Sequence, residues 1–172
     1  MEMASKDRLI EAGMALLLQR GYNHLGIQDV LVATELPKGS FYHHFESKEA
    51  FGALAVVDRY MVAVHHGLDA TLLDERVAPL QRIRNFFEAT RESYKGDGYL
   101  GCLLGGLGQE LSGINETFRA RIEGCIGQIA SKIEVCLRLA VARGDVAANK
   151  NPRHLAALLV NCWEGAAHAL AA

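Results

Sequence analysis

Five residues in one short stretch are of types that suit contact with nucleic acid: Lys38, Gly39, Ser40, Tyr42 and His43. Lysine, hydroxyl and amide groups donate hydrogen bonds to phosphates and base edges, and glycine lets the backbone approach a surface closely. All five fall within residues 38–43, so one short helix would carry them together.

Cys102 is the second candidate for chemistry. It follows a glycine-containing segment at the expected start of a helix, where the helix dipole and free N–H groups favour a thiolate. Lys95 would support that charge, whereas Asp97 would oppose it. The alternative is that Cys102 is a small buried residue that lets helices pack closely, which the glycines around it would also suit.

The residues of the first candidate site need a helix-turn-helix to position them. Apolar residues at three- and four-residue steps predict a helix over 5–20, ended by Gly21. A short apolar helix follows, then a tight turn at Glu35-Leu36 and a second short helix opened by Pro37. Such a second helix can enter a DNA major groove. His43 and His44 diverge by ~100° on a helix, so we expect one to face DNA and the other to face the flank of the module, with no metal site between them.

Helix signals continue to the end of the sequence. Ser47 is the expected N-cap of a long helix to about residue 73, and Pro79 opens the next. A glycine-rich helix over about 102–111 follows, Asn115 caps a long helix to residue 143, and Asn151 starts the last one. No stretch alternates with period two, so no sheet is expected. The prediction is an all-α fold, with a three-helix helix-turn-helix module at 1–46 and a helical-bundle body at 47–172.

Composition limits the class of protein. The chain has 172 residues, is 50% hydrophobic and has a net charge of −2. Residues 1–48 hold five Lys and Arg against six Asp and Glu, which argues against a strong nonspecific grip on phosphates. There is no long apolar run for a membrane span and no signal-peptide pattern, so we expect a cytoplasmic protein. Cysteine spacing predicts no zinc site or disulfide. The remaining cysteines are expected in the core: Cys125, Cys136 and Cys162.

The run Leu36-Pro-Lys-Gly-Ser-Phe-Tyr-His-His-Phe45, followed by Ser47-Lys48-Glu49, resembles the TetR family of bacterial transcriptional repressors. The resemblance implies an all-helical homodimer that binds double-stranded palindromic operator DNA and holds an effector pocket in its body. It places Lys38, Gly39, Ser40 and His43 where the recognition helix meets bases and backbone. By the same resemblance Tyr42 and Lys48 would meet phosphates, and Gln28 would contact the backbone or a base. No metal or cofactor is implied.

The segment Tyr99–Leu111 resembles, more loosely, a branch of the family that includes sensors of reactive electrophiles. In that branch a cysteine at the position of Cys102 can be the sensing thiol. We therefore expect a small apolar or electrophilic effector near Cys102. Its pocket would be lined by Phe86, Phe87, Tyr94, Leu103 and Trp163, and core packing is the alternative for each of these residues. The resemblance also implies one further helix after the segment that ends at Ala172.

Two other classes of protein compete with this prediction. A small helical enzyme is disfavoured because the sequence has no GxSxG, HExxH or Walker motif. A helical protein-interaction module that does not bind DNA stays open, because the N-terminal module is not basic. The two classes differ in what they predict: Lys48→Ala and Tyr42→Phe would weaken operator binding by a repressor and would change nothing in an interaction module.

Overall fold

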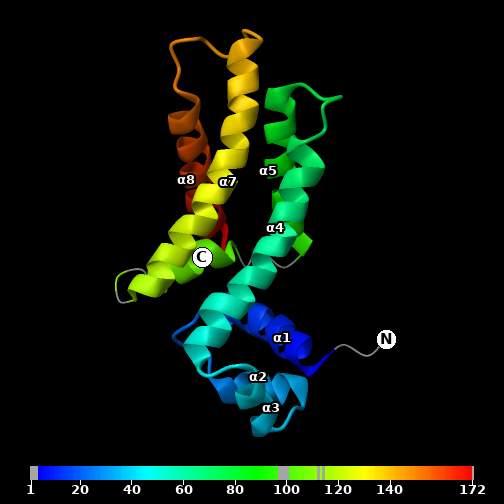
Figure 1. The fold of residues 1–172 in the computed structure, drawn as a ribbon, viewed down its shortest axis with the longest axis vertical. Helices are drawn as coiled ribbons and strands as arrows, with labels where there is room; N and C mark the ends of the chain where they lie inside the picture. Colours follow the sequence, from blue (N-terminus) through cyan, green and yellow to red (C-terminus); the bar gives the residue numbers. More distant parts are fainter. Residues whose placement is uncertain (1–3, 97–100, 112, 114, 172) are drawn as a thin grey trace. The chain divides into compact units, whose positions relative to one another are not determined.

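The computed structural model describes residues 4–96, 101–111, 113 and 115–171, and within them it contains helices and no strand (Figure 1). This confirms the predicted all-α class. The α-helices are α1 (Ser5–Arg20), α2 (Ile27–Thr34), α3 (Lys38–His44), α4 (Val57–Leu72), α5 (Pro79–Gly96), α6 (Leu103–Leu111), α7 (Glu116–Ala142) and α8 (Pro152–Ala171). None of these helices is long and apolar enough to cross a bilayer.

The helix ends follow the predicted capping residues. The Ser47 hydroxyl accepts the backbone N–H of Ala50 at 3.0 Å. Asn115 accepts the N–H of Phe118 at 3.0 Å, and Asn151 accepts the N–H of Arg153 at 2.9 Å. These side chains satisfy N–H groups that the first turn of a helix leaves unpaired, which is why they start helices.

The helix that follows Ser47 differs from the prediction. Residues Ala50–Val56 form a π-helix, and only from Val57 does a regular α-helix continue as α4. In this stretch Phe51 packs on α1 so closely that a Cβ on Gly13 would lie 2.2 Å from the Phe51 ring. Apolar periodicity does not report this long-range packing, so a uniform α-helix was expected. Pro37 also lies one position earlier than expected, as the N-cap of α3.

Packing divides the chain into two compact units. The first combines the chain up to Val62 with Leu103–Arg121, and the second combines Ala63–Cys102 with the chain from Ile122 onward. The predicted boundary between residues 46 and 47 is a division by function and remains a prediction. The packing units do not coincide with it, because α6 and the first turns of α7 pack with the N-terminal helices.

Three aromatic rings form the centre of the first unit. Phe41 is fully buried, with its ring centroid 5.2 Å from that of Phe51 and 5.4 Å from that of Phe45. Phe45 and Phe51 complete the triangle at 5.0 Å. Phe41 and Phe45 are therefore core residues, as predicted, and their burial fixes which face of α3 points outward.

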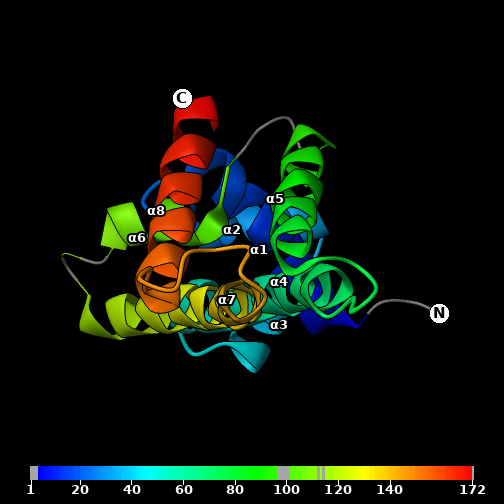
Figure 2. The ribbon, with the colours of Figure 1, turned by 90° about the horizontal axis from the view of Figure 1, so that it is seen from above.

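The second unit is built from α5, α8 and the adjoining parts of α4 and α7 (Figures 1 and 2). α4 pairs with α7 through an ion pair between Asp69 and Lys132 and a hydrogen bond between His65 and Gln128 at 2.9 Å. Cys125 and Cys136 are buried in the core, as predicted. The prediction for Cys162 was wrong: it is exposed. The buried stripe of α8 runs through Ala156, Val160 and Ala167, and Cys162 falls outside that stripe.

Candidate functional site

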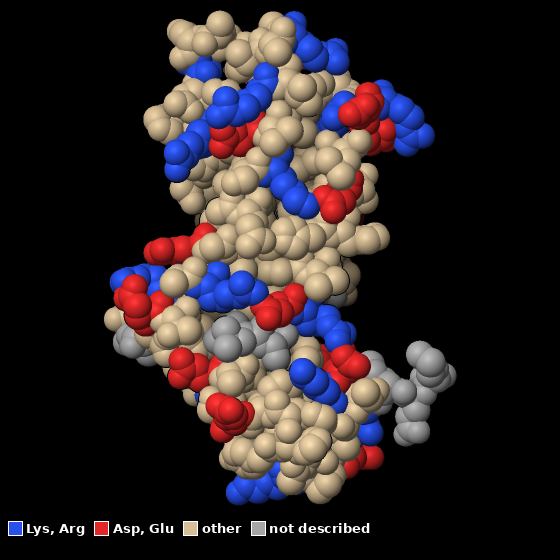
Figure 3. All heavy atoms as spheres, in the orientation of Figure 1, with Lys and Arg blue, Asp and Glu red and all other residues tan. Residues whose placement is uncertain are grey.

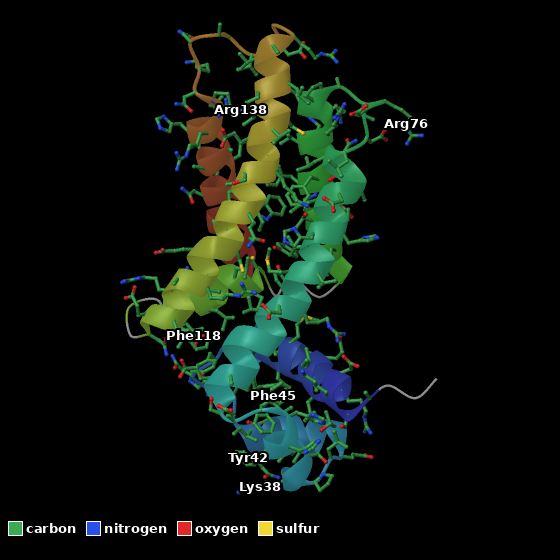
Figure 4. The ribbon with its side chains drawn as sticks, viewed as in Figure 1. Lys38, Tyr42, Phe45, Arg76, Phe118 and Arg138 are labelled. Atoms are coloured by element: carbon green, nitrogen blue, oxygen red, sulfur yellow. The ribbon has the colours of Figure 1, made fainter. Side chains whose placement is uncertain are left out.

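The outward face of α3 carries four of the seven predicted nucleic-acid contacts. The exposed residues are Lys38, Gly39, Tyr42 and His43, and 50% of the Tyr42 surface is accessible to solvent. Figure 4 shows Lys38 and Tyr42 on this helix. The Lys38 ammonium lies 5.8 Å from the centroid of the Tyr42 ring. A cation and a phenol hydroxyl are thus presented side by side, a pairing suited to a phosphate.

The other predicted contacts are placed differently. Gln28 is exposed in the first turn of α2, and Ser40 is half-buried on α3. Gly39 has open space around it: a Cβ built there would meet no atom within 4 Å. Nothing inside the described part of the chain therefore demands glycine at this position. An exposed position at the start of a helix suits glycine when a second surface must come close to the backbone.

Two side-chain hydrogen bonds hold α1 against the helix-turn-helix formed by α2 and α3. His44 pairs through Nε2 with the Ser5 hydroxyl at 2.8 Å, and Arg8 donates to the carbonyl oxygen of Thr34 at the end of α2. His44 thus faces the flank of the module and His43 faces outward, as expected for neighbouring histidines. In the described part of the chain no group of three His, Cys, Asp or Glu residues could hold a metal ion.

Lys48 points inward rather than along the exposed face. Its ammonium donates to the Tyr22 carbonyl oxygen at 2.6 Å and lies 4.2 Å from the centroid of the Tyr22 ring. Burial lowers the pKa of Lys48, while the carboxylates of Glu110 and Asp29 oppose that shift. An ammonium has three donors, so the bond to Tyr22 does not use its whole capacity. In the view of Figure 3, Lys and Arg atoms do not gather into a continuous patch.

The turn between α1 and α2 is held by a residue that sequence reasoning missed. Glu110, near the end of α6, accepts the backbone N–H of Tyr22 at 3.0 Å and that of Asn23 at 2.8 Å. We call this pair of bonds the Glu110 clamp. Gly21 makes room for it, because a Cβ there would lie 2.1 Å from a Glu110 carboxylate oxygen. From the sequence, Gly21 is predicted only to end a helix, and no other nearby residue indicates the Glu110 clamp.

The predicted effector-site aromatics come together between α5 and α8. The Trp163 ring centroid lies 5.1 Å from that of Phe87 and 5.9 Å from that of Tyr94. Phe86 is buried and reaches the cluster through Phe87, at 5.3 Å. Aromatic side chains commonly line the sites of small apolar ligands.

Cys102 is half-buried and directly precedes α6. Burial raises the pKa of Glu164, the neighbour of Trp163 on α8, and the nearby Cys102 thiol counteracts part of that rise. Sequence reasoning did not single out Glu164, although a lone acid in the apolar stripe of the last helix was a visible signal.

Comparison with known proteins places this arrangement in a family. A model of bacterial regulatory proteins of the tetR family matches residues 9–52, and a model of the tetracyclin repressor-like C-terminal domain matches residues 79–172. The second match alone covers more than half of the chain.

The protein belongs to the TetR family. The repressor DhaR of Mycobacterium sp. strain GP1 is 35% identical over 161 residues, which cover 94% of this chain and 79% of DhaR. The repressor NemR of Escherichia coli is 35% identical over 131 residues, covering 75% of this chain and 65% of NemR. A crystal structure of a TetR regulatory protein from Rhodobacter sphaeroides has a TM-score of 0.91 at 36% identity, covering 96% of this chain and 87% of that one.

Membership in the family bears on the enzyme class that the sequence disfavoured. The family and these relatives are transcriptional regulators, so the enzyme alternative is excluded. The N-terminal unit of the present protein contains the DNA-binding helix-turn-helix of the family, formed by α2 and α3. TetR-family regulators act as dimers on operator DNA.

Proposed function

We propose that this TetR-family protein is a dimeric repressor of a palindromic operator, released when a small apolar or electrophilic effector acts on its body, through modification of Cys102. Residues 1–46 would form the DNA-binding domain and residues 47–172 the effector-binding and dimerisation domain. The observation that carries the proposal is α6, a single nine-residue helix. Cys102 directly precedes its first residue, and Glu110 in its last turn clamps the turn between α1 and α2.

A modified Cys102 would act on DNA binding through this helix. Adding a group to a half-buried thiol changes the packing at the start of α6. A rigid helix passes such a displacement to its other end, here the Glu110 clamp, which holds α1 and α2. Two recognition helices of a dimer must be spaced by about 34–36 Å to enter successive major grooves, so a small shift of each module lowers operator affinity.

On the DNA side, we propose that the exposed residues of α3 and Gln28 make the contacts: Lys38, Gly39, Ser40, Tyr42 and His43. Lys48 would reach a phosphate with the donors that its bond to Tyr22 leaves over. Because the module is not basic, affinity would depend on these placed contacts and on two copies of the module.

Fluorescence anisotropy with DNA flanking the protein's own gene tests the DNA half of the proposal. We expect salt-dependent, sequence-selective binding, weakened by Tyr42→Phe and Lys48→Ala; each lost phosphate contact lowers the salt slope by about one. Lys150→Ala, at an exposed lysine between α7 and α8, is the matched control. Equal binding by all variants would support the interaction-module alternative.

The effector half is tested with the same complex. Treatment with a thiol-reactive electrophile should release wild-type protein from its operator and should leave Cys102→Ser bound. Cys162→Ser removes an exposed thiol and should respond as wild type does. Equal release of the Cys102→Ser variant would reject Cys102 as the sensing residue.

A further inference from the structure

Lys6 is an exposed cation in the first turn of α1, outside the set of proposed DNA contacts. It precedes residues 9–52, the segment that the tetR family model matches, so no family role carries over to it. Its ammonium lies 6.0 Å from the centroid of the Phe45 ring. Phe45 is the C-cap residue of α3. The charge of Lys6 is therefore held at the C-terminal end of α3.

Two hydrogen bonds keep the first turn of α1 at this place. The Ser5 hydroxyl pairs with Nε2 of His44, the last residue of α3, at 2.8 Å. About one turn further along α1, Arg8 donates to the carbonyl oxygen of Thr34 at the end of α2. The residue between these two anchors, Lys6, is thus fixed relative to both helices of the helix-turn-helix. A side chain on a fixed backbone loses less conformational entropy when it binds a ligand.

The carboxylates nearest to Lys6 along α1 are engaged elsewhere. Arg59, near the start of α4, forms ion pairs with both Asp7 and Glu11. In the part of the chain that the structure describes, neither Lys6 nor Lys38 forms an ion pair with a carboxylate. The near-balance of acids and bases over residues 1–48 therefore hides two cations whose charge is not used inside the protein.

These two cations lie at opposite ends of α3. Lys38 is its first residue and Phe45, beside Lys6, follows its last residue (Figure 4). At ~1.5 Å per residue the two ends are about 10 Å apart, close to the ~12 Å width of a DNA major groove. When α3 lies in that groove, its ends come close to the sugar–phosphate backbone. The exposed carboxylate of Glu46, next to Phe45, repels phosphate at this end, so binding there requires a nearby cation.

We propose that Lys6 binds a phosphate of the operator backbone at the end of α3 away from Lys38. This inference rests on the proposed binding of an operator. The contact is ionic and reads no base, so it contributes to affinity and register and not to sequence preference. Each module of the dimer carries one copy, which adds two placed phosphate contacts to a module that is not basic. Ser5 acts as a positioning residue, because its bond to His44 holds the turn that carries Lys6.

Fluorescence anisotropy over a range of salt concentrations tests the contact, with the full-length chain and the operator located in the DNA flanking its own gene. Lys6→Met removes the charge and keeps an apolar stem beside Phe45. We expect roughly tenfold or weaker binding at about 0.1 M salt and a salt slope lower by about two, one for each copy in the dimer. Lys6→Arg keeps the charge and should retain the wild-type slope. Lys150→Met, at an exposed lysine between α7 and α8, is the matched control and should bind as wild type does.

Neutral methylphosphonate groups, placed one at a time along the operator backbone, locate the phosphate. The group that replaces the phosphate bound by Lys6 should weaken binding by wild type and should have no further effect on Lys6→Met. Ser5→Ala tests the positioning role, since it removes the bond to His44 and leaves the lysine in place. It should weaken binding by wild type and change nothing in the Lys6→Met background, because the two residues act as one unit.

The outcomes separate this inference from the proposed function. Binding by Lys6→Met within twofold of wild type would overturn the inference and leave the proposed function intact. So would weaker binding with an unchanged salt slope, which indicates a packing role, or the lack of any methylphosphonate position whose effect depends on Lys6. Failure of the wild-type chain to bind any flanking sequence selectively would instead overturn the proposed function.

Discussion

Replacing Glu110 with alanine removes both acceptors of the Glu110 clamp. A hydrogen bond to a charged group contributes about 1.5–3 kcal/mol. Asn23 is exposed, so its N–H regains a water molecule and recovers most of that energy. Tyr22 is half-buried, and its N–H loses more. We therefore expect that, in Glu110→Ala, the free energy required to open the turn between α1 and α2 falls by about 2 kcal/mol.

Amide hydrogen exchange followed by NMR measures this opening directly. A fall of about 2 kcal/mol corresponds to roughly thirtyfold faster exchange at the Tyr22 amide, because each 1.4 kcal/mol is a factor of ten. Gln109→Ala alters the exposed neighbour on the same helix and should leave this rate unchanged. An exchange rate at Tyr22 within twofold of wild type would refute the reasoning.

The same variant tests whether α6 passes the effector signal. If the Glu110 clamp transmits movement, Glu110→Ala should still bind the operator but should release it poorly after electrophile treatment. Gly21→Ala perturbs the clamp from the other side: its backbone has φ 72° and ψ 172°, a region open essentially to glycine and strained by about 1–3 kcal/mol for other residues. The added Cβ also displaces Glu110, so Gly21→Ala should be less harmful in the Glu110→Ala background. Equal losses of stability in both backgrounds, measured by urea unfolding, would contradict this coupling.

Three further predictions concern single residues. Gly39→Ala should fold with equal or greater stability, because alanine is favoured over glycine in a helix by up to ~1 kcal/mol, yet should bind operator DNA at least tenfold more weakly in anisotropy; unchanged binding would show that DNA does not approach α3 there. Gly13→Ala should lower the urea-unfolding free energy by about 1–3 kcal/mol through overpacking against Phe51, whereas Gly67→Ala on α4, with no atom within 4 Å of its added Cβ, should not. Because burial raises the folded-state pKa of Glu164, its contribution to stability is present below the unfolded pKa and is lost as pH rises through the folded pKa; the melting temperature of Glu164→Gln should therefore exceed that of wild type at pH 8, with the gap closing below about pH 4.

Local signals in the sequence predicted the helices well. Ser47, Asn115 and Asn151 start helices because their side chains bond to N–H groups two or three residues on, and Gly144 ends α7 with a positive φ of 81°. Each of these interactions spans a few residues, so each can be read from a short window of sequence. The exposed face of α3 was predictable for the same reason, since burial of Phe41 and Phe45 determines what points outward.

Interactions between distant segments could not be read in this way. The Glu110 clamp joins residues 88 positions apart, and nothing near Glu110 marks it as a partner of Tyr22. Lys48 was expected to face phosphate because its immediate neighbours match the family, but its inward contact depends on Tyr22, 26 residues away. The exposure of Cys162 likewise depends on distant segments, because they determine which face of α8 is covered.

The π-helix at Ala50–Val56 has a consequence for insertions and deletions in this chain. Deleting one residue from a regular helix turns everything beyond it by ~100° and removes its buried stripe from the core. A π segment contains one residue more than an α-helix needs between the same two flanks. Loss of a single residue from 50–56 would therefore convert it to a regular α-helix and leave Ser47 and α4 in register. Relatives one residue shorter at this point would be expected to retain the fold, which makes this segment a natural site for length variation within the long helix.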